Sequence, residues 1–152
     1  MGEVSAGIVL FRRKGTALEV LLVHPGGPYC IRRDKAGWSI PKGGVLPGEE
    51  PIDAARREYG EETGFPAEGP LIPLGFVRYS GGKRVHAWAM EGDLDPARVR
   101  SIAFSLEWPP HSGQMKEFQE IDRAEWFNLE AARDKLHAGL VPLLEALRKA
   151  LG

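Results

Sequence analysis

Apolar residues recur at every second position from Val4 to Leu10, which is the spacing of a β-strand with one buried face. A short basic segment ending at Gly15 follows this run and predicts a turn. Residues 18–24, LEVLLVH, are apolar almost without interruption, as expected for a strand in the interior of a sheet. The start of the chain therefore predicts a β-hairpin.

The segment from Pro51 to Thr63 carries the clearest helical pattern in the sequence. Proline is favoured at the first helical position, because its missing N–H would have no partner there. Gly64 suits the position just after the last turn, where a left-handed backbone is common. Gly60 lies inside the helix and costs about 1 kcal/mol relative to alanine. We expect that its small size allows close packing against the sheet or a loop.

The rest of the chain predicts further strands mixed with two helices. We expect a short extended piece at 38–40, strands at 71–79, 83–91, 102–108 and 121–127, a turn at Ser80–Gly82, helices at 129–137 and 141–151, and loops at 25–37 and 109–118. Strands and helices do not alternate regularly. This order favours an α+β or mixed α/β sandwich, formed by a single domain over residues 1–152.

Composition limits the classes of protein that fit. The chain has 152 residues, 43% hydrophobic and 27% charged, a balance typical of one globular domain. A net charge of −1 leaves no general basic field, so local groups must handle any anionic ligand. Cys30 is the single cysteine, which excludes an internal disulfide and a Cys-x-x-Cys metal site. The N-terminal apolar run is too short for a secretory or membrane segment, and we expect a cytoplasmic protein.

Three glutamates break the local rules of the predicted helix. Glu58, Glu61 and Glu62 fall within an arc of roughly 100° and should repel one another. They form either a solvated acidic face or a cluster that needs a counter-charge. That counter-charge is either arginine, with Arg56 and Arg57 adjacent, or a hard divalent cation, which prefers oxygen ligands.

The wider spacing of residues 43–65 decides between these alternatives. Gly43, Glu49, Arg57-Glu58, Glu61-Glu62 and Gly64-Phe65 follow the pattern G-x5-E-x7-R-E-U-x-E-E-x-G-U, where U is a bulky apolar residue. This pattern resembles the signature of the Nudix hydrolases. Tyr59 departs mildly from it, because the family usually has an aliphatic residue there. The order of strands and helices is also similar to the α/β/α sandwich of the family.

The resemblance implies a metal-dependent hydrolase. Members cleave a nucleoside diphosphate linked to another moiety, with water attacking phosphorus and Mg²⁺ or Mn²⁺ as cofactor. Glu58, Glu61 and Glu62 match the metal-binding positions. One of them, most often Glu58 or Glu61 by position, acts as the base on the water.

Other positions of the signature match supporting roles. Glu49 either assists the metal site or orients Arg57, and Arg57 serves as a structural tether of the catalytic site rather than a phosphate binder. The carbonyl of Lys42 or Gly43 completes a metal shell, because glycine lets the backbone come close. Glu120 is a further candidate metal ligand, since the family often carries a glutamate at about this distance before a tryptophan such as Trp126. Glu117 is its less favoured neighbour.

Several residues outside the signature are candidates for binding substrate. An ammonium at Lys42, in SIPKGG, would hold a phosphate as a point charge. Tyr79 is a candidate for stacking on a base, although the spacing from Phe65 is short. The other candidates flank the expected cleft or lie in nearby loops, and each also has an ordinary surface or packing interpretation: Arg32, Arg33, Lys83, Arg84, His86, Trp108 and His111.

The function expected first is hydrolysis of a dinucleoside polyphosphate such as diadenosine tetraphosphate, because Pro41-Lys42-Gly43 and Glu120 are similar to such enzymes. Nucleoside triphosphates, including oxidised guanine nucleotides, come second, and nucleotide sugars or ADP-ribose third. A non-catalytic nucleotide-sensing module would usually lack a signature carboxylate. An RNA-decapping enzyme would share the signature, but the net charge argues against nucleic acid as a partner. We expect a small-molecule nucleotide as partner and no membrane, and leave monomer or homodimer open.

Overall fold

The computed structural model describes residues 3–79 and 81–152, and it begins with the expected hairpin. Strand β1 (Val4–Lys14) pairs antiparallel with β2 (Ala17–Pro25), with Phe11 opposite Val20. Both strands are longer than the apolar runs that predict them, because pairing continues into the basic turn. Residues 6–10 and 20–24 are buried, which places this hairpin in the middle of the molecule.

The main sheet has the order β4-β5-β1-β2-β8, with the short strand β3 paired to β1. Its other strands are β3 (Lys42–Gly44), β4 (Ile72–Arg78), β5 (Arg84–Glu91) and β8 (Ile121–Asn128). Strand β5 runs parallel to β1, whereas the other pairs are antiparallel. The predicted mixed sheet is therefore confirmed. Ser80, in the predicted turn between β4 and β5, lies outside the described residues.

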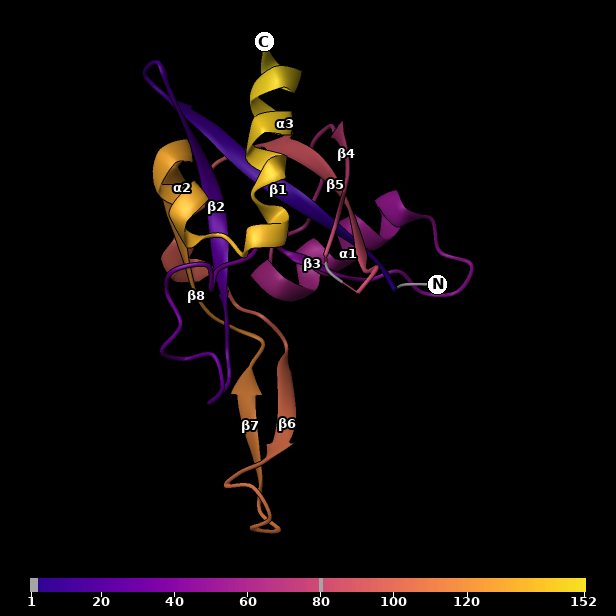
Figure 1. Cartoon of the computed structure of the whole chain (residues 1–152), viewed down its shortest axis with the longest axis vertical. Helices are drawn as coiled ribbons and strands as arrows, with labels where there is room; N and C mark the ends of the chain where they lie inside the picture. The colour runs from indigo at the N-terminus through magenta and orange to yellow at the C-terminus, as the bar shows by residue number, and fades with distance from the viewer. Residues whose placement is uncertain (1–2, 80) are drawn as a thin grey trace.

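Helices cover both faces of the sheet (Figure 1). On one face, α1 (Pro51–Thr63) packs Ala54, Ala55 and Tyr59 against alternate residues of β1 such as Ile8 and Leu10. The opposite set of β1 residues contacts α2 (Leu129–Lys135) and α3 (Pro142–Leu151). Short 3₁₀ turns lie at Pro96–Arg98 and Ala138–Leu140. Because the strand alternation separates two cores, the chain forms the predicted α/β/α sandwich.

Helix α1 has the predicted bounds and ends. Pro51 occupies its first turn, and Gly64 takes a left-handed backbone with φ of 80° while its N–H donates to the Gly60 carbonyl. The expectation of close packing at Gly60 is wrong, because an added Cβ there would meet nothing nearer than the Phe65 carbonyl at 3.8 Å. The glycine at this position has no packing explanation.

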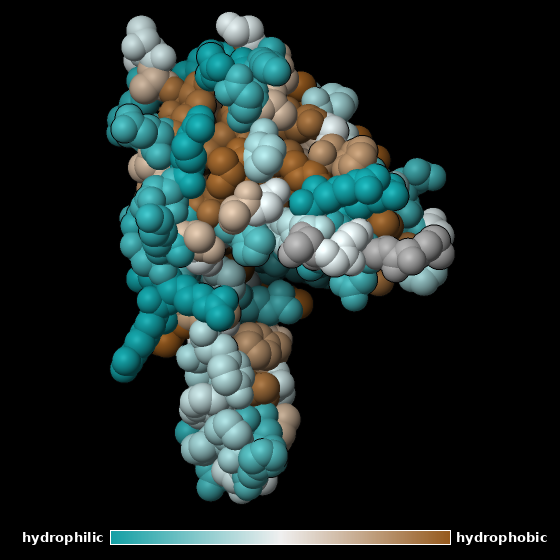
Figure 2. Space-filling view, viewed as in Figure 1, coloured by the Kyte–Doolittle hydropathy of each residue, from teal (hydrophilic) through white to brown (hydrophobic). Residues whose placement is uncertain are grey.

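Residues 109–118, predicted as a loop, contain a strand. Strand β7 (Met115–Gln119) pairs antiparallel with β6 (Ala103–Glu107) to form an arm, β6–β7, that projects from the body (Figure 1). The sequence MKEFQ has few apolar residues, so pairing with β6 decides its structure. Figure 2 shows a hydrophobic area across the upper middle of the body, bordered by hydrophilic residues, and a few apolar residues along one side of the arm.

Within residues 3–79 and 81–152, no helix combines the length and the apolar character that crossing a bilayer requires.

Candidate active site

The carboxylate of Glu58 lies directly against the backbone of Gly43 on β3. A Cβ added to Gly43 would fall 1.7 Å from Glu58 Oε2, so any other residue at this position would displace the carboxylate. The Glu58 side chain is only 13% exposed. Burial, together with the neighbouring Glu61, raises its pKa to about 7 against the opposing effect of Arg57.

Glu62 lies deeper than Glu58 and is held by the same strand. The Lys42 backbone N–H donates to Glu62 Oε1 at 3.2 Å. Burial raises the pKa of Glu62 to about 8, although Lys42 acts in the opposite direction. Both acids therefore favour a proton or another cation beside them near neutral pH.

Glu120 lies beside Glu62, where the β6–β7 arm joins the body of the domain. The Ile102 N–H donates to the Glu61 carbonyl at the end of α1, and the Glu120 N–H donates to the Ile102 carbonyl, each at 3.0 Å. The pKa of Glu120 is raised by partial burial and by Glu61. Glu120, Glu62 and Lys42 line one cavity of about 310 Å³. Glu117 lies further along β7, is exposed, and does not line this cavity.

The Arg57 side chain contacts the loop before α1, strand β3 and the acidic face of the helix. Its Nε and Nη2 donate to the two oxygens of Glu49 at 2.9 and 3.0 Å, and Nη2 also donates to the Gly44 carbonyl at 2.9 Å. Its Nη1 lies 3.4 Å from Glu58 and Glu61. These contacts are what a structural tether would make, and that role for Arg57 stays a prediction. Glu49 also accepts a hydrogen bond from the Leu46 N–H. Both of its carboxylate oxygens are therefore held in place while they accept from Arg57.

We expect Arg57→Lys to lower the free energy of unfolding by about 1–2 kcal/mol, because a lysine cannot keep the bidentate contact with Glu49 and the Gly44 carbonyl together. Urea unfolding of the two proteins measures this change. Arg148→Lys is the control: among the described residues Arg148 pairs with Glu145 alone, on the exposed side of α3, and such pairs contribute little. Equal stability of Arg57→Lys and wild type would contradict the tether.

The donor set fits a hard divalent cation. Carboxylates from one helix face Lys42 and Gly43 of β3, and Mg²⁺ or Mn²⁺ prefers such oxygen ligands. Within the described ranges, no three acidic, imidazole or thiol groups already stand in an arrangement that could hold a metal. Arg57 Nη1 lies 3.4 Å from both Glu58 and Glu61 and offsets part of their negative charge.

The raised pKa of Glu62 predicts how the stability of the metal-free protein changes with pH. An acid whose pKa is about 8 when folded and 4.5 as a free group binds more protons in the folded state between those values. Stability must then fall as pH rises through that window, on the order of 2–4 kcal/mol for Glu62. Urea unfolding in EDTA from about pH 5 to pH 8.5 tests this expectation.

Two variants separate this effect from the general titration of the protein. Glu62→Gln is expected to flatten the loss of stability with pH, because an amide does not titrate. Glu68→Gln, at an exposed position, should retain the wild-type slope. A Glu62→Gln profile as steep as that of the wild type would show that Glu62 does not carry the effect.

Lys42 lies between the carboxylates and a second hollow of about 430 Å³, which Lys83 also lines. Burial lowers the pKa of Lys42, and Lys83 lowers it further. The Nζ atoms of Lys42 and Lys83 lie 5.9 and 5.7 Å from the ring centre of Tyr79. The structure thus brings together three of the residues predicted to bind substrate.

One side of the Tyr79 ring is already stacked on the ring of His137. Its ring lies 4.6 Å from that of His137, and a Cβ added to Gly139 would fall 2.3 Å from Tyr79 Cδ1. Burial raises the pKa of Tyr79 to about 12, so the phenol stays neutral. A nucleobase would have to use the remaining side of the ring.

The other candidates lie outside the lining of these two hollows. Arg84 lies over the ring of Phe76, which also packs against His86. The exposed Arg33 belongs to the loop 25–37, together with Arg32, and its carbonyl faces buried His24 at 2.5 Å. Trp108 packs on Tyr29 near the tip of the arm, and His111 lies in the tip itself.

Sequence reasoning missed four residues that line the cavity of Glu62 and Glu120. They are Pro25 at the end of β2, Ser39 in the extended piece before β3, Phe104 on β6 and Ile121 at the start of β8. The Phe104 ring also lies over Gly27, where a Cβ would approach its Cζ to 3.0 Å. Alternation along β6 does indicate an inward Phe104, but only the fold shows that the arm begins beside α1.

Comparison with known proteins identifies the family of the chain. The NUDIX domain model matches residues 1–147. An RNA pyrophosphohydrolase of Bartonella henselae is 31% identical over 146 residues, which cover 83% of this chain and 76% of that protein. An octanoyltransferase of Myxococcus xanthus is 30% identical over 134 residues, covering 87% of this chain but only 32% of that protein. The chain thus spans about a third of the octanoyltransferase.

Solved structures resemble the whole chain. The Ap4A hydrolase of C. elegans, in a binary complex, has a TM-score of 0.66 and 26% identity over 97% of each chain. The NUDIX domain of Shewanella oneidensis NrtR, solved with ADP ribose, has a TM-score of 0.67 and 17% identity over all of this chain and 90% of that one, a likeness of fold. The fold, the signature residues on α1 and the domain match agree, and the chain belongs to the Nudix hydrolase family.

Proposed function

We propose that this chain, as a single Nudix domain over residues 1–152, hydrolyses a pyrophosphate bond of a nucleoside diphosphate linked to a second group. The observation that carries the proposal is the acidic face of α1, packed against Gly43 and bordered by Lys42. Acidic groups alone would repel a pyrophosphate. A divalent cation, Mg²⁺ or Mn²⁺, would reverse the local charge and stabilise charge on the attacking and leaving oxygens.

The residues of the chain have distinct parts in this proposal. Glu58, Glu61 and Glu62, with Glu120 as a further ligand, hold the cation. Glu58 or Glu61 takes the proton of the attacking water, and a Glu58 pKa of about 7 suits a base that works near neutral pH. Arg57 keeps α1 and β3 in register through Glu49. Lys42 and Lys83 offer ammonium groups to the phosphates that are not cleaved.

A dinucleoside polyphosphate is the first substrate to test. The likeness to the C. elegans Ap4A hydrolase, over nearly the whole of both chains, supports this choice. So does the pair of lysines beside Tyr79, because a long polyphosphate needs cationic groups beyond the metal. The second candidate is the 5′ end of an RNA, favoured by relatives described as RNA pyrophosphohydrolases. Nucleoside triphosphates are the third.

A substrate panel in ¹⁸O-labelled water separates these candidates. Diadenosine tetraphosphate, GTP, an oxidised guanine nucleotide, ADP-ribose and a 5′-triphosphate RNA are compared by kcat/KM, and the label in the products identifies the attacked phosphorus. We expect diadenosine tetraphosphate to give the highest value. A higher value for the RNA would replace the first candidate by the second, and no turnover of any substrate with Mg²⁺ or Mn²⁺ would refute hydrolysis.

A further inference from the structure

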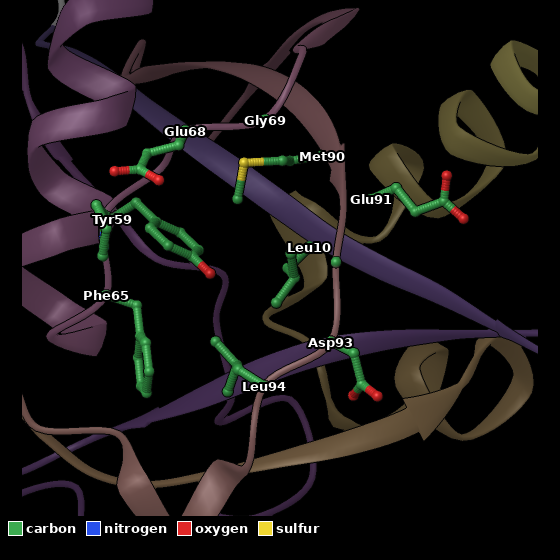
Figure 3. A pocket seen from close by; sticks show the side chains of 11 residues that line it. Leu10, Tyr59, Phe65, Glu68, Gly69, Met90, Glu91, Asp93 and Leu94 are labelled. Atoms are coloured by element: carbon green, nitrogen blue, oxygen red, sulfur yellow. The ribbon is translucent and has the colours of Figure 1, made fainter.

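A third cavity, distinct from the two beside Lys42, lies on a different side of α1 from the carboxylates. It has a volume of about 280 Å³ and is bordered by α1, the segment that follows it, β1 and the end of β5. Leu10, Phe65, Met90 and Leu94 form apolar walls around the ring of Tyr59 (Figure 3). The glutamates of the candidate active site do not line it. It is therefore separate from the site of the proposed reaction.

The hydroxyl of Tyr59 points into the middle of this cavity, between Met90, Leu10 and Leu94 (Figure 3). Tyr59 is 2% exposed, and none of the described residues forms a hydrogen bond with its hydroxyl. The Thr63 hydroxyl, four residues further along the helix, donates to the Tyr59 backbone carbonyl at 2.7 Å. Buried hydroxyls normally have a partner. Every fully enclosed side-chain oxygen of the described residues has a hydrogen-bond partner. Because the Tyr59 hydroxyl has none, it must be open to the cavity.

The walls favour an aromatic guest. The sulfur of Met90 makes favourable contacts with aromatic rings, and the ring of Phe65 can pack edge to face with another ring. A ligand that fits a cavity of about 280 Å³ has few atoms, so each contact is a large part of its binding free energy. A phenol ordinarily has a pKa of about 10, so the Tyr59 hydroxyl carries its proton at neutral pH and can donate it to an acceptor.

The charges around the cavity argue against an anion. The charged residues of its lining are acidic: Glu68, Glu91 and Asp93. Figure 3 shows Glu91 pointing away from the interior, and Asp93 accepts from Arg12 at 2.8 Å. A phosphate or carboxylate would enter an apolar space with acidic groups at its edge, without a free cation in the lining. The nucleotide substrates of the proposed reaction are therefore excluded from it.

We propose that this cavity is a binding site for a small uncharged aromatic molecule whose oxygen accepts a hydrogen bond from the Tyr59 hydroxyl. The site follows from the residue that departs from the family signature: an aliphatic side chain at position 59 would offer no donor. The proposal does not depend on the reaction at the other side of α1.

Three probes of similar size test the chemistry of the site in the full chain. Acetophenone is neutral and has an acceptor, ethylbenzene has no acceptor, and benzoate is an anion. Methyl resonances of Met90, Leu10 and Leu94 are followed by NMR during titration. We expect acetophenone to shift them with Kd on the order of 1 mM. Ethylbenzene should bind about three- to tenfold more weakly, and benzoate more weakly than ethylbenzene.

Tyr59→Phe is the decisive variant, because it removes only the hydroxyl. It should lower the affinity for acetophenone to that for ethylbenzene, about three- to tenfold, and leave ethylbenzene binding unchanged. Circular dichroism of the variant checks its fold. The proposal is overturned if acetophenone shifts none of these methyl groups, if benzoate binds as tightly, or if Tyr59→Phe binds acetophenone like the wild type.

Discussion

Glu58→Gln is expected to lower kcat by about 10²- to 10⁴-fold, the range expected when a positioned base is lost. The amide keeps the size of the side chain and its contact with Gly43, but it removes a charge that holds the cation and a group that can accept a proton from water. Steady-state kinetics at saturating Mg²⁺ measure the change. Because the charge of Glu58 is partly buried and repelled by Glu61, its loss should not lower the thermal stability in EDTA.

A matched glutamate controls for the loss of a single negative charge. Glu50 is exposed at the start of α1 and makes no side-chain capping bond, so Glu50→Gln should retain activity within about twofold. Glu61→Gln and Glu62→Gln are expected to behave like Glu58→Gln. A glutamate whose glutamine variant keeps nearly full activity has no part in catalysis. The base is the one of Glu58 and Glu61 whose replacement also removes the acidic limb of the pH profile of kcat.

Gly43→Ala should lower kcat by at least about tenfold while leaving the protein folded. The new Cβ would overlap Glu58 Oε2, which stands 1.7 Å from its ideal position. That oxygen is the end of a flexible side chain, so Glu58 can move aside at modest cost in stability. The displaced carboxylate then no longer lies against the backbone of β3.

Gly44→Ala is the control for Gly43→Ala. It changes the adjacent glycine of the same strand, and its Cβ would meet nothing within 4 Å. Kinetics and thermal unfolding of the two variants separate a local clash from a general effect of alanine in β3. Equal activity of the two variants would contradict the part assigned to Gly43.

Much of the architecture follows from local patterns. Apolar residues predict β1, β2, β4, β5 and β8, because these strands contact the cores on the two sides of the sheet. Proline and glycine at its ends predict α1 to the residue. Strand β3 was not predicted, since KGG has no strand propensity and is extended only because β1 pairs with it. The β6–β7 arm was missed in part for the same reason.

The site shows the same division between local and long-range information. The signature indicates which glutamates share a face of α1, because helical spacing alone fixes that arrangement. It does not indicate that both oxygens of Glu49 hold Arg57, or that Lys42 lies over Tyr79 beside Lys83. Those contacts join residues from separate strands and loops. Phe104 reaches the cavity because Ile102 is hydrogen-bonded to the end of α1, which no local pattern reveals.

Anomalous scattering from crystals soaked in Mn²⁺ with a non-cleavable nucleotide tests the central claim most directly. We predict a manganese peak at about 2.1–2.3 Å from carboxylate oxygens of Glu58, Glu61 or Glu62, with the phosphates of the nucleotide as further ligands. Manganese bound only elsewhere, or a nucleotide seated away from α1, would contradict the claim.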